Sequence, residues 1–250
     1  MPSDAVLVRP ATLADAPAMA DVHVDSRAAN VGSMPAMVHD RATTHRWMTG
    51  RLEAGSTGWV AERDGRVVGY AVVTGEWLDD LFLAPGETGL GVGRVLLDVV
   101  KSELPDGFCL WAFESNAGAR RFYRRHGLVE LERTDGSTNA EHSPDVRMAW
   151  PGRDPLTYLR HLIDDVDDQV GDLLARRVAL TREVQPLKTG RGRDPERERE
   201  IAARLAQRAP ELGEDRVARI VHAIITESLD AVVSEGPGAP TATDRTDDVG

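Results

Sequence analysis

Three glycines at alternate positions make the stretch 88–94 the part of the sequence most suggestive of ligand binding. It reads Thr88-Gly89-Leu90-Gly91-Val92-Gly93-Arg94 and lies between a predicted strand and a predicted helix. Backbone N–H groups can surround an anion where side chains are absent, and a helix N-terminus adds partial positive charge. A dinucleotide-binding pattern is excluded because Leu96 stands in place of its third glycine. A Walker pattern is excluded as well, so we predict a pyrophosphate-binding turn, against the alternative of a flexible connection.

A second group of reactive side chains follows a predicted strand at 108–113. The polar residues that end this strand precede a short predicted helix bearing Tyr123. This order would place one hydrogen-bond donor and one proton source on the same side of a sheet. Taken alone, Tyr123 would more often be a core aromatic with a satisfied hydroxyl.

A third candidate site lies in the second half of the chain, where a cation interrupts an apolar stripe. The spacing of that stripe, in steps of four and three, places Arg177 on its apolar seam. A buried guanidinium is costly unless an anion pairs with it, so the pattern indicates either a pocket for an anionic ligand or internal pairing with Asp167 or Asp194. The apolar members of the stripe are Leu159, Ile163, Val166, Val170, Leu173, Leu180, Val184 and Leu187.

Two further cations, Lys188 and Arg160, are candidates for the same site. Lys188 follows Arg177 by 11 positions, which at ~100° per residue returns to nearly the same face of a helix. Arg160 precedes Arg177 by 17 positions, or about 25 Å along one helix, so it cannot share a small ligand with Arg177 of the same chain. It could reach the site of a second subunit if the long helices pair antiparallel, and we therefore predict a homodimer built by the helical domain.

The elements that must position the first two groups alternate between strands and helices. Such an order over 1–150, with a hairpin around 63–66, predicts a mixed α/β domain. The predicted strands are 6–9, 58–62, 67–73, 77–83, 108–113, 128–133 and 146–150, and the predicted helices are 12–27, 41–52, 92–104 and 117–126.

The remainder of the chain carries helical patterns alone. Residues 151–155 hold two prolines and a glycine and predict a linker. Three helices are predicted in a domain over 156–235, with Asp194 and Pro195 opening the second of them. The Gly-, Pro-, Thr- and Asp-rich tail 236–250 is predicted to be disordered.

Composition excludes several classes of function. The net charge is −11, from 30 basic and 41 acidic residues, and neither half of the chain is basic, which argues against nucleic acid as a partner. Apolar runs stay short of the ~18 residues of a membrane span, and the N-terminus does not resemble a signal peptide. With Cys109 as the single cysteine and no metal-ligand spacing among the seven histidines, we expect a cytoplasmic protein without a metal.

Residues 5–150 resemble a GNAT-family N-acetyltransferase. The resemblance rests on the Arg9-Pro10-Ala11 opening, the Leu81–Pro85 strand that leads into the glycine turn, and one longer signature. That signature is Glu114-x-Asn116-x-x-Ala119-Arg120-x-Phe122-Tyr123-x-x-x-Gly127. It implies an α/β domain in which a mixed sheet is flanked by helices.

The resemblance also implies a chemistry for these residues. Acetyl-CoA would be the cosubstrate, with its pantetheine arm at Asn116, and Tyr123 would protonate the leaving thiolate after an amine attacks the thioester. Its pyrophosphate would lie on the backbone of Thr88, Gly89, Leu90, Gly91, Val92, Gly93 and Arg94, although the family usually has Gln or Arg where Thr88 stands. The general base stays open among Glu76, Asp79 and Asp80, of which at least one is expected to be solvated edge charge. The amine acceptor stays open too.

Residues 154–233 resemble an all-helical, three-helix chorismate mutase. The matching motifs are Leu159-Arg160-x-x-Ile163-Asp164-x-x-Asp167, Leu174-x-x-Arg177, Val184-x-x-x-Lys188, Asp194-Pro195-x-Arg197-Glu198 and Ile224-Ile225-x-x-Ser228. The resemblance implies conversion of chorismate to prephenate, a step of aromatic amino acid biosynthesis, by electrostatic stabilisation without covalent chemistry.

The resemblance implies that these residues bind parts of the substrate, namely its two carboxylates, its hydroxyl and the oxygen of the breaking C–O bond. Arg160 of the partner subunit, Arg177, Arg197 and Ser228 would bind carboxylates, Lys188 the ether oxygen, and Glu198 the substrate hydroxyl. Two departures stand out. Val232 occupies the position where the family commonly has Gln or Glu, and Pro186 interrupts the helix two residues before Lys188.

The sequence thus predicts a bifunctional fusion of an acetyltransferase and a chorismate mutase. Two alternatives remain open. One domain could be non-catalytic, either an acetyl-CoA-responsive module or a dimerisation module. The helical domain could instead act on amino-chorismate or isochorismate.

Overall fold

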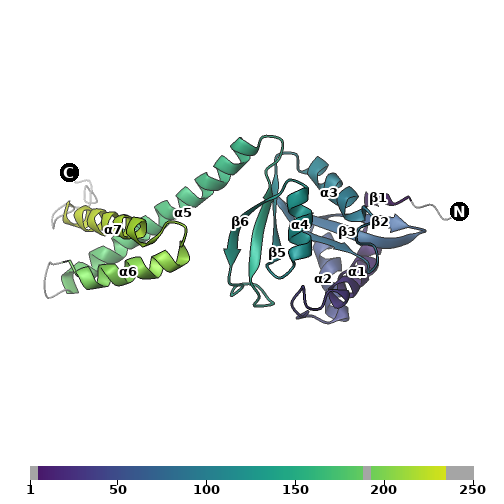
Figure 1. The fold of residues 1–250 in the computed structure, drawn as a ribbon, viewed down its shortest axis with the longest axis horizontal. Coiled ribbons are helices and arrows are strands. Elements are labelled where there is room, and N and C mark those ends of the chain that lie inside the picture. The colour runs from purple at the N-terminus through teal and green to yellow at the C-terminus, as the bar shows by residue number, and fades with distance from the viewer. Residues whose placement is uncertain (1–4, 188–192, 235–250) are drawn as a thin grey trace, which may run out of the picture. The chain divides into compact units, whose positions relative to one another are not determined.

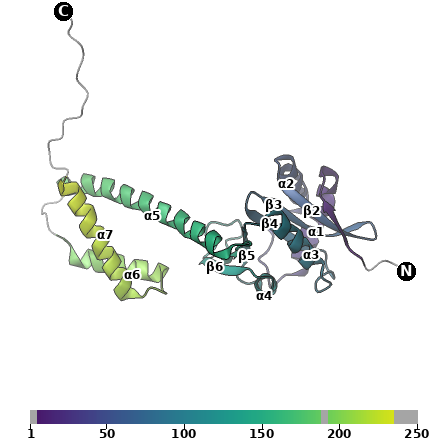
Figure 2. The same cartoon turned by 90° about the horizontal axis from the view of Figure 1, so that it is seen from above.

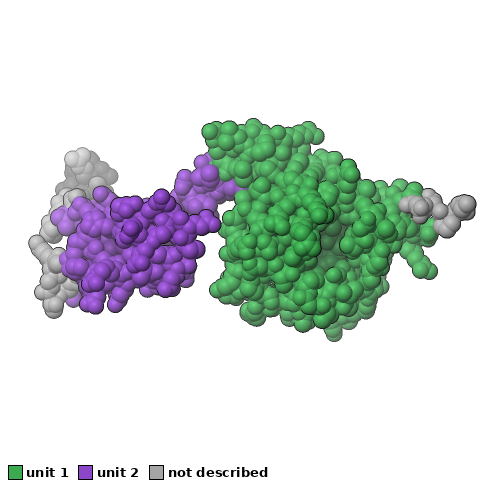
Figure 3. Space-filling view, viewed as in Figure 1, with its two compact units in different colours: residues 1–161 green, residues 162–250 purple. Residues whose placement is uncertain are grey.

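The protein divides into two compact units, residues 1–161 and residues 162–250 (Figure 3). The computed structural model describes residues 5–187 and 193–234. Lys188 and the predicted tail 236–250 lie outside these residues. Over the described ranges, every helix is too short or too polar to cross a lipid bilayer.

A seven-stranded sheet forms the centre of the first unit (Figure 1). Its strands follow the order β1-β2-β3-β4-β5-β7-β6, and every neighbouring pair is antiparallel except β4 and β5. This confirms the predicted mixed sheet. The strands are β1 (Leu7–Pro10), β2 (Thr57–Arg63), β3 (Arg66–Thr74), β4 (Trp77–Leu83), β5 (Phe108–Phe113), β6 (Val129–Thr134) and β7 (Asp145–Trp150).

The parallel pair β4–β5 is held together at one point only. Trp77 lies opposite Cys109, and the Cys109 amide donates to the carbonyl of Glu76 at 2.9 Å. Strands that no longer exchange ladder hydrogen bonds separate, so β4 and β5 diverge beyond this point and leave a gap in the middle of the sheet.

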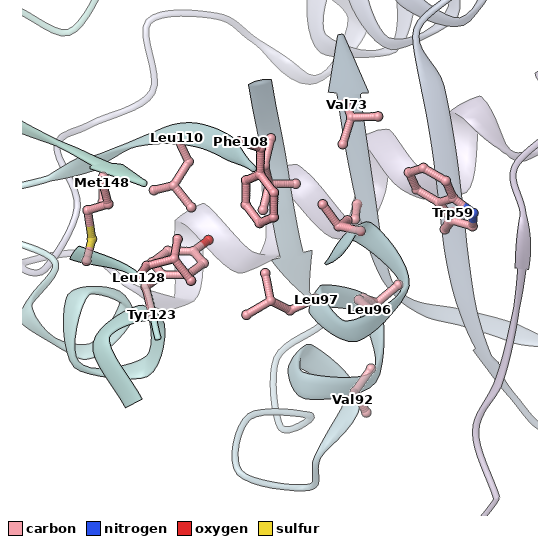
Figure 4. Packing of buried hydrophobic residues seen from close by; sticks show 14 of the residues in the cluster. Trp59, Val73, Val92, Leu96, Leu97, Phe108, Leu110, Tyr123, Leu128 and Met148 are labelled. Carbon is pink, nitrogen blue, oxygen red and sulfur yellow. The ribbon is translucent and has the colours of Figure 1, made fainter. Parts of the chain in front are cut away.

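Helices cover both faces of this sheet. Along β3, Tyr70 and Val72 face one core, while Ala71 and Val73 between them face the other, as the two-residue period of a strand requires. The first core is closed by α1 (Ala16–Ala29) and α2 (Arg41–Glu53), and the second by α3 (Val92–Glu103) and α4 (Ala117–Arg125). Figure 4 shows the second core, with Leu96 and Leu97 of α3 beside Phe108 and Leu110 of β5.

The second unit is helical, as predicted. Its helices are α5 (Pro155–Val184), which begins in the first unit, α6 (Pro195–Arg208) and α7 (Glu214–Ser234) (Figure 2). Asp194 caps α6 by accepting from the amides of Glu196 and Arg197, and the α6–α7 core contains Ala202, Val217 and Val221.

The first of these helices differs from the other two in its burial. None of the residues of α5 is buried, although its apolar stripe runs along most of its length. The α-helix ends at Val184 and one 3-10 turn, Gln185–Leu187, follows. Pro186 explains this ending, because proline lacks the N–H that another α-helical turn requires.

Candidate functional site

The glycine turn lies at the N-terminus of α3, as the sequence predicted. Gly89 and Gly91 both have φ of +85°, a left-handed conformation that L side chains rarely adopt, and Gly91 is the N-cap residue. The space where their Cβ atoms would stand is open to 4 Å. A ligand can therefore approach this backbone closely.

The side chains of the turn have different surroundings. Thr88, Gly89, Gly91, Gly93 and Arg94 line a cavity of about 820 Å³. In contrast, the side chain of Leu90 is exposed and that of Val92 is buried in the core with α3. Neither Leu90 nor Val92 lines the cavity.

The same cavity passes through the gap between β4 and β5. Residues of both strands line it, among them Asp80 and Phe82 on β4 and Leu110 and Ala112 on β5. It also reaches α4 on one face of the sheet and α1 on the other. The gap thus joins the glycine turn to groups on both faces of the sheet.

Asn116 and Tyr123 both line this cavity, from α4 and its N-terminus. Asn116 Oδ1 accepts from the amide of Ala119 at 3.0 Å and so caps α4, while its amide nitrogen forms no hydrogen bond with a described residue. Tyr123 packs in the second core (Figure 4) and is 8% exposed, and its hydroxyl forms no hydrogen bond with a described residue. Burial raises the pKa of Tyr123 far above its ordinary value, so the hydroxyl stays protonated and can donate.

Asp80 is the carboxylate that faces the cavity from β4. Its side chain is 6% exposed, and Oδ2 accepts from Arg51 of α2. Oδ1 lies 3.9 Å from Nδ1 of His23 and accepts no hydrogen bond from any described residue. Burial raises the pKa of Asp80 to about 6, and the nearby charge of Arg51 limits the rise.

Of the three carboxylates proposed from the sequence, Asp80 alone is buried. Glu76 is exposed in the turn before β4, and Asp79 is exposed and pairs with Arg51. The pairing of β3 with β4 explains the contrast, because Val72 lies opposite Asp80 and Val73 opposite Leu78, which leaves Asp79 as an extra residue. A bulge of this kind redirects side chains, so both aspartates reach the same arginine.

His23 of α1 completes the polar groups beside Asp80. Its Nδ1 lies 2.8 Å from the hydroxyl of Tyr70, and its ring lies 4.3 Å from that of Phe82. Burial, followed by the charges of Arg27 and Arg51, lowers the pKa of His23 to about 4, so the ring is neutral at neutral pH. His23, Arg27 and Arg51 were not predicted from the sequence, because no motif surrounds them.

Arg177 is half-buried in the second unit and has no carboxylate partner within residues 5–187 and 193–234. Its Nη1 donates to the carbonyl of Ile224 at 3.3 Å, and Ser228, itself buried, donates to the same oxygen at 2.6 Å. Desolvation lowers the pKa of Arg177. Asp194 caps α6 and does not pair with Arg177.

The other residues proposed for this site are less closely grouped. Glu198 accepts hydrogen bonds from Nε and Nη2 of Arg193, each at 2.7 Å. Nη1 of Arg193 donates to the hydroxyl of Thr226 at 2.8 Å. This role of Arg193 was not predicted from the sequence. Arg160 and Arg197 are exposed, and Val232 is half-buried one turn after Ser228.

Comparisons with known proteins match two different family models to the two parts of the chain. Residues 54–130 match the model of the acetyltransferase (GNAT) domain, and residues 159–232 match the model of chorismate mutase type II. The first match covers β2 through the start of β6, and so includes the glycine turn, Asp80 and Tyr123.

Two relatives, and the solved structure of one of them, match the first part of the chain. Peptidyl-lysine N-acetyltransferase YjaB of Escherichia coli (strain K12) is 33% identical over 96 residues, which are 38% of this chain and 64% of that protein. Peptidyl-lysine N-acetyltransferase YiaC of the same organism is 29% identical over 101 residues, 39% and 66% of the two chains. The solution structure of apo-form YjaB from Escherichia coli is 23% identical, with a TM-score of 0.49, over 59% of this chain and 99% of that one. The chain thus spans slightly less than two thirds of the length of these curated relatives.

Proposed function

We propose, from the premise that the chain carries a GNAT acetyltransferase domain followed by a chorismate mutase type II domain, that it catalyses both reactions. The first unit would transfer an acetyl group from acetyl-CoA to a primary amine, and the second would rearrange chorismate to prephenate. One observation carries the first half of this proposal. A single cavity through the β4–β5 gap is lined by the glycine turn, a protonated tyrosine and a buried carboxylate with a free oxygen.

The residues of the turn fit the pyrophosphate of acetyl-CoA. Gly89 and Gly91 present bare backbone to the cavity, and the N-terminus of α3 adds partial positive charge. Asn116 has an amide nitrogen left to donate to the pantetheine arm. Bound there, acetyl-CoA would supply an acetyl group activated as a thioester.

Asp80 and Tyr123 would handle the two protons of the transfer. Asp80 Oδ1 would accept the proton that the amine nitrogen loses as this nitrogen bonds to the acetyl carbon. Tyr123 would donate its hydroxyl proton to the sulfur as the C–S bond breaks, so that amide and free thiol leave the site. The neutral ring of His23 beside Asp80 keeps a second positive charge away from the incoming ammonium.

Acetyl-CoA binding can be tested at the turn. Replacing Gly91 by Ala is expected to weaken acetyl-CoA binding by about tenfold or more, because a Cβ disfavours its left-handed φ by about 1–2 kcal/mol and displaces the amides. Calorimetric titration measures this. Gly65→Ala places the same strain in the β2–β3 turn, away from the cavity, and should bind as wild type does. Wild-type protein that binds no acetyl-CoA at millimolar concentration would refute the assignment.

For the second unit, the guanidinium of Arg177 supports an anionic substrate, because no carboxylate among the described residues pairs with it. Chorismate carries two carboxylates, and Arg177, Arg197, Ser228 and Arg160 of the partner subunit would bind them. Lys188 would donate to the ether oxygen and Glu198 would accept from the substrate hydroxyl, with Arg193 fixing the position of Glu198. Incubation of the purified protein with chorismate, following its loss, is the direct test.

A homodimer through α5 is part of this proposal. Apolar side chains of α5 are exposed along its length, at Ile163, Val166, Val170, Leu173, Leu180 and Val184. A continuous exposed apolar face of this kind marks an interaction surface. A symmetric pair of α5 helices would cover it, and would bring Arg160 of the partner subunit toward Arg177.

The dimer should depend on the centre of that face. Leu173 is 62% exposed in the single chain, and Leu173→Glu is expected to weaken association by about 100-fold or more. Each buried leucine contributes about 1.5–3 kcal/mol, and a symmetric interface buries two of them. Light scattering over a concentration series measures the shift, with Ala175→Glu as control, because Ala175 is exposed and points about 200° away from Leu173 around the helix. A wild-type monomer at micromolar concentration would contradict the dimer.

A further inference from the structure

A groove of about 720 Å³ lies next to the cavity and contains three indole rings. They belong to Trp47 of α2, Trp77 of β4 and Trp111 of β5. Trp47 is 41% exposed and Trp111 is 42% exposed, although both are large apolar side chains. Groove and cavity share Asp80 and its neighbours, so a molecule that lies in the groove can reach the proposed general base.

The indole rings are held in place by their neighbours. Trp77 and Trp111 are stacked at 6.4 Å with an interplanar angle of 9°. The guanidinium of Arg147 lies 5.1 Å from the ring of Trp77, and that of Arg51 lies 4.9 Å from the ring of Trp47. Rings fixed in this way offer a preformed apolar wall, because little side-chain entropy remains to be lost on binding.

The charge of the groove favours a cation. Asp79 and Asp80 both line it, and a single arginine, Arg51, pairs with both. When both carboxyls are ionised, one negative charge is left without a compensating cation in the groove. A carboxylate on the ligand would be repelled by this negative charge, whereas an ammonium would be attracted to the free oxygen of Asp80.

The other approach to the cavity, past the segment between α1 and α2, is crossed by several contacts. Arg27 of α1 donates to the carbonyl of Pro35 and pairs with Glu141, each at 3.0 Å. Ser115 donates to the carbonyl of Ser33 at 3.0 Å. These bonds join the segment to the β5–α4 and β6–β7 connections, and they also neutralise Arg27.

We propose that the acetyl acceptor enters through the tryptophan groove and is an alkylammonium without a carboxylate beside the amine. This inference rests on the acetyl transfer proposed above. The methylene chain lies along the indole rings, and the ammonium is attracted to Asp80. The ammonium releases one proton to water to become a neutral amine, and Asp80 accepts the second proton as the nitrogen bonds to the acetyl carbon. The side chain of lysine has this chemistry, whereas a free α-amino acid presents a carboxylate to an acidic groove.

Gly50 offers a way to fill the groove without disturbing the fold. It lies on α2, lines the groove, and has open space to 4 Å where its Cβ would stand. Gly50→Phe is expected to raise the KM for pentylamine by about tenfold or more, while the Kd for acetyl-CoA stays within about twofold of wild type. Gly171→Phe places the same ring on a helical glycine of α5 with equally open space, and should leave both values unchanged.

A pair of acceptors tests the charge argument on the wild-type protein. Norleucine is pentylamine with a carboxylate on the carbon that bears the amine. We expect kcat/KM to be at least about tenfold higher for pentylamine than for norleucine, since the carboxylate of norleucine is repelled by the negative charge of the groove. Pentylamine titrated without acetyl-CoA should also change the tryptophan fluorescence, and Gly50→Phe should remove that change.

Two results would overturn the inference. One is an unchanged pentylamine KM in folded Gly50→Phe, and the other is a preference for norleucine. Both outcomes differ from failure of acetyl transfer itself, in which acetyl-CoA is bound but no acetylated amine of any kind is formed.

Discussion

Replacement of Asp80 by Asn is expected to slow acetyl transfer by about 10²–10⁴-fold, the usual contribution of a positioned general base. The amide has nearly the same shape and can still accept from Arg51, so the surrounding structure should persist. It cannot take the proton of the attacking amine. Steady-state kinetics with pentylamine and acetyl-CoA measure the loss, and calorimetry checks that acetyl-CoA still binds.

The pH dependence gives this prediction a second readout. The base acts in its ionised form, and burial raises the pKa of Asp80 to about 6. The rate should therefore increase as the pH rises through about 6 and should be low below that pH. This inflection should vanish in Asp80→Asn. Glu76→Gln alters an exposed carboxyl before the same strand and should keep both rate and inflection. An Asp80→Asn enzyme with wild-type rate and an unchanged profile would assign the base elsewhere.

Loss of Arg177 should have the second large effect, on the rearrangement of chorismate. Arg177→Ala is expected to lower kcat/KM by at least about 10²–10³-fold, the usual cost of one preorganised donor. Arg177→Lys should fail nearly as badly, because an ammonium cannot bind a carboxylate through two parallel hydrogen bonds. The absorbance of chorismate follows the reaction.

Arg176 supplies the control for this prediction. It precedes Arg177 on α5, is exposed, and points about 100° away around the helix, so Arg176→Ala should keep the activity. Val232→Gln should raise turnover, because it adds a second donor one turn after Ser228. Wild-type protein that leaves chorismate untouched, with or without the Gln substitution, would exclude this substrate.

Local sequence determined most of the helices and strands, together with the glycine turn at Gly91 and the apolar stripe of α5. The strand Trp77–Leu83 has the predicted ends, and α6 begins after Asp194 as its cap signal indicated. The turn around Gly91 was recognisable because left-handed backbone strongly favours glycine. These features depend on a few neighbouring residues, so a single sequence contains them. The apolar stripe of α5 was predicted in the same way, from periodicity alone, but its exposure in the single chain was not predicted.

Tertiary structure decided which side chains meet. Asp79 and Asp80 are adjacent carboxylates, and only a bulge in the β3–β4 pairing together with burial under α1 and α2 distinguishes them. His23 and Arg51 come from distant segments and reach Asp80 because those helices pack on the same face of the sheet. The three indoles of the groove likewise come from α2, β4 and β5. Long-range packing sets the desolvation and the charge at each of these atoms, and no local pattern encodes it.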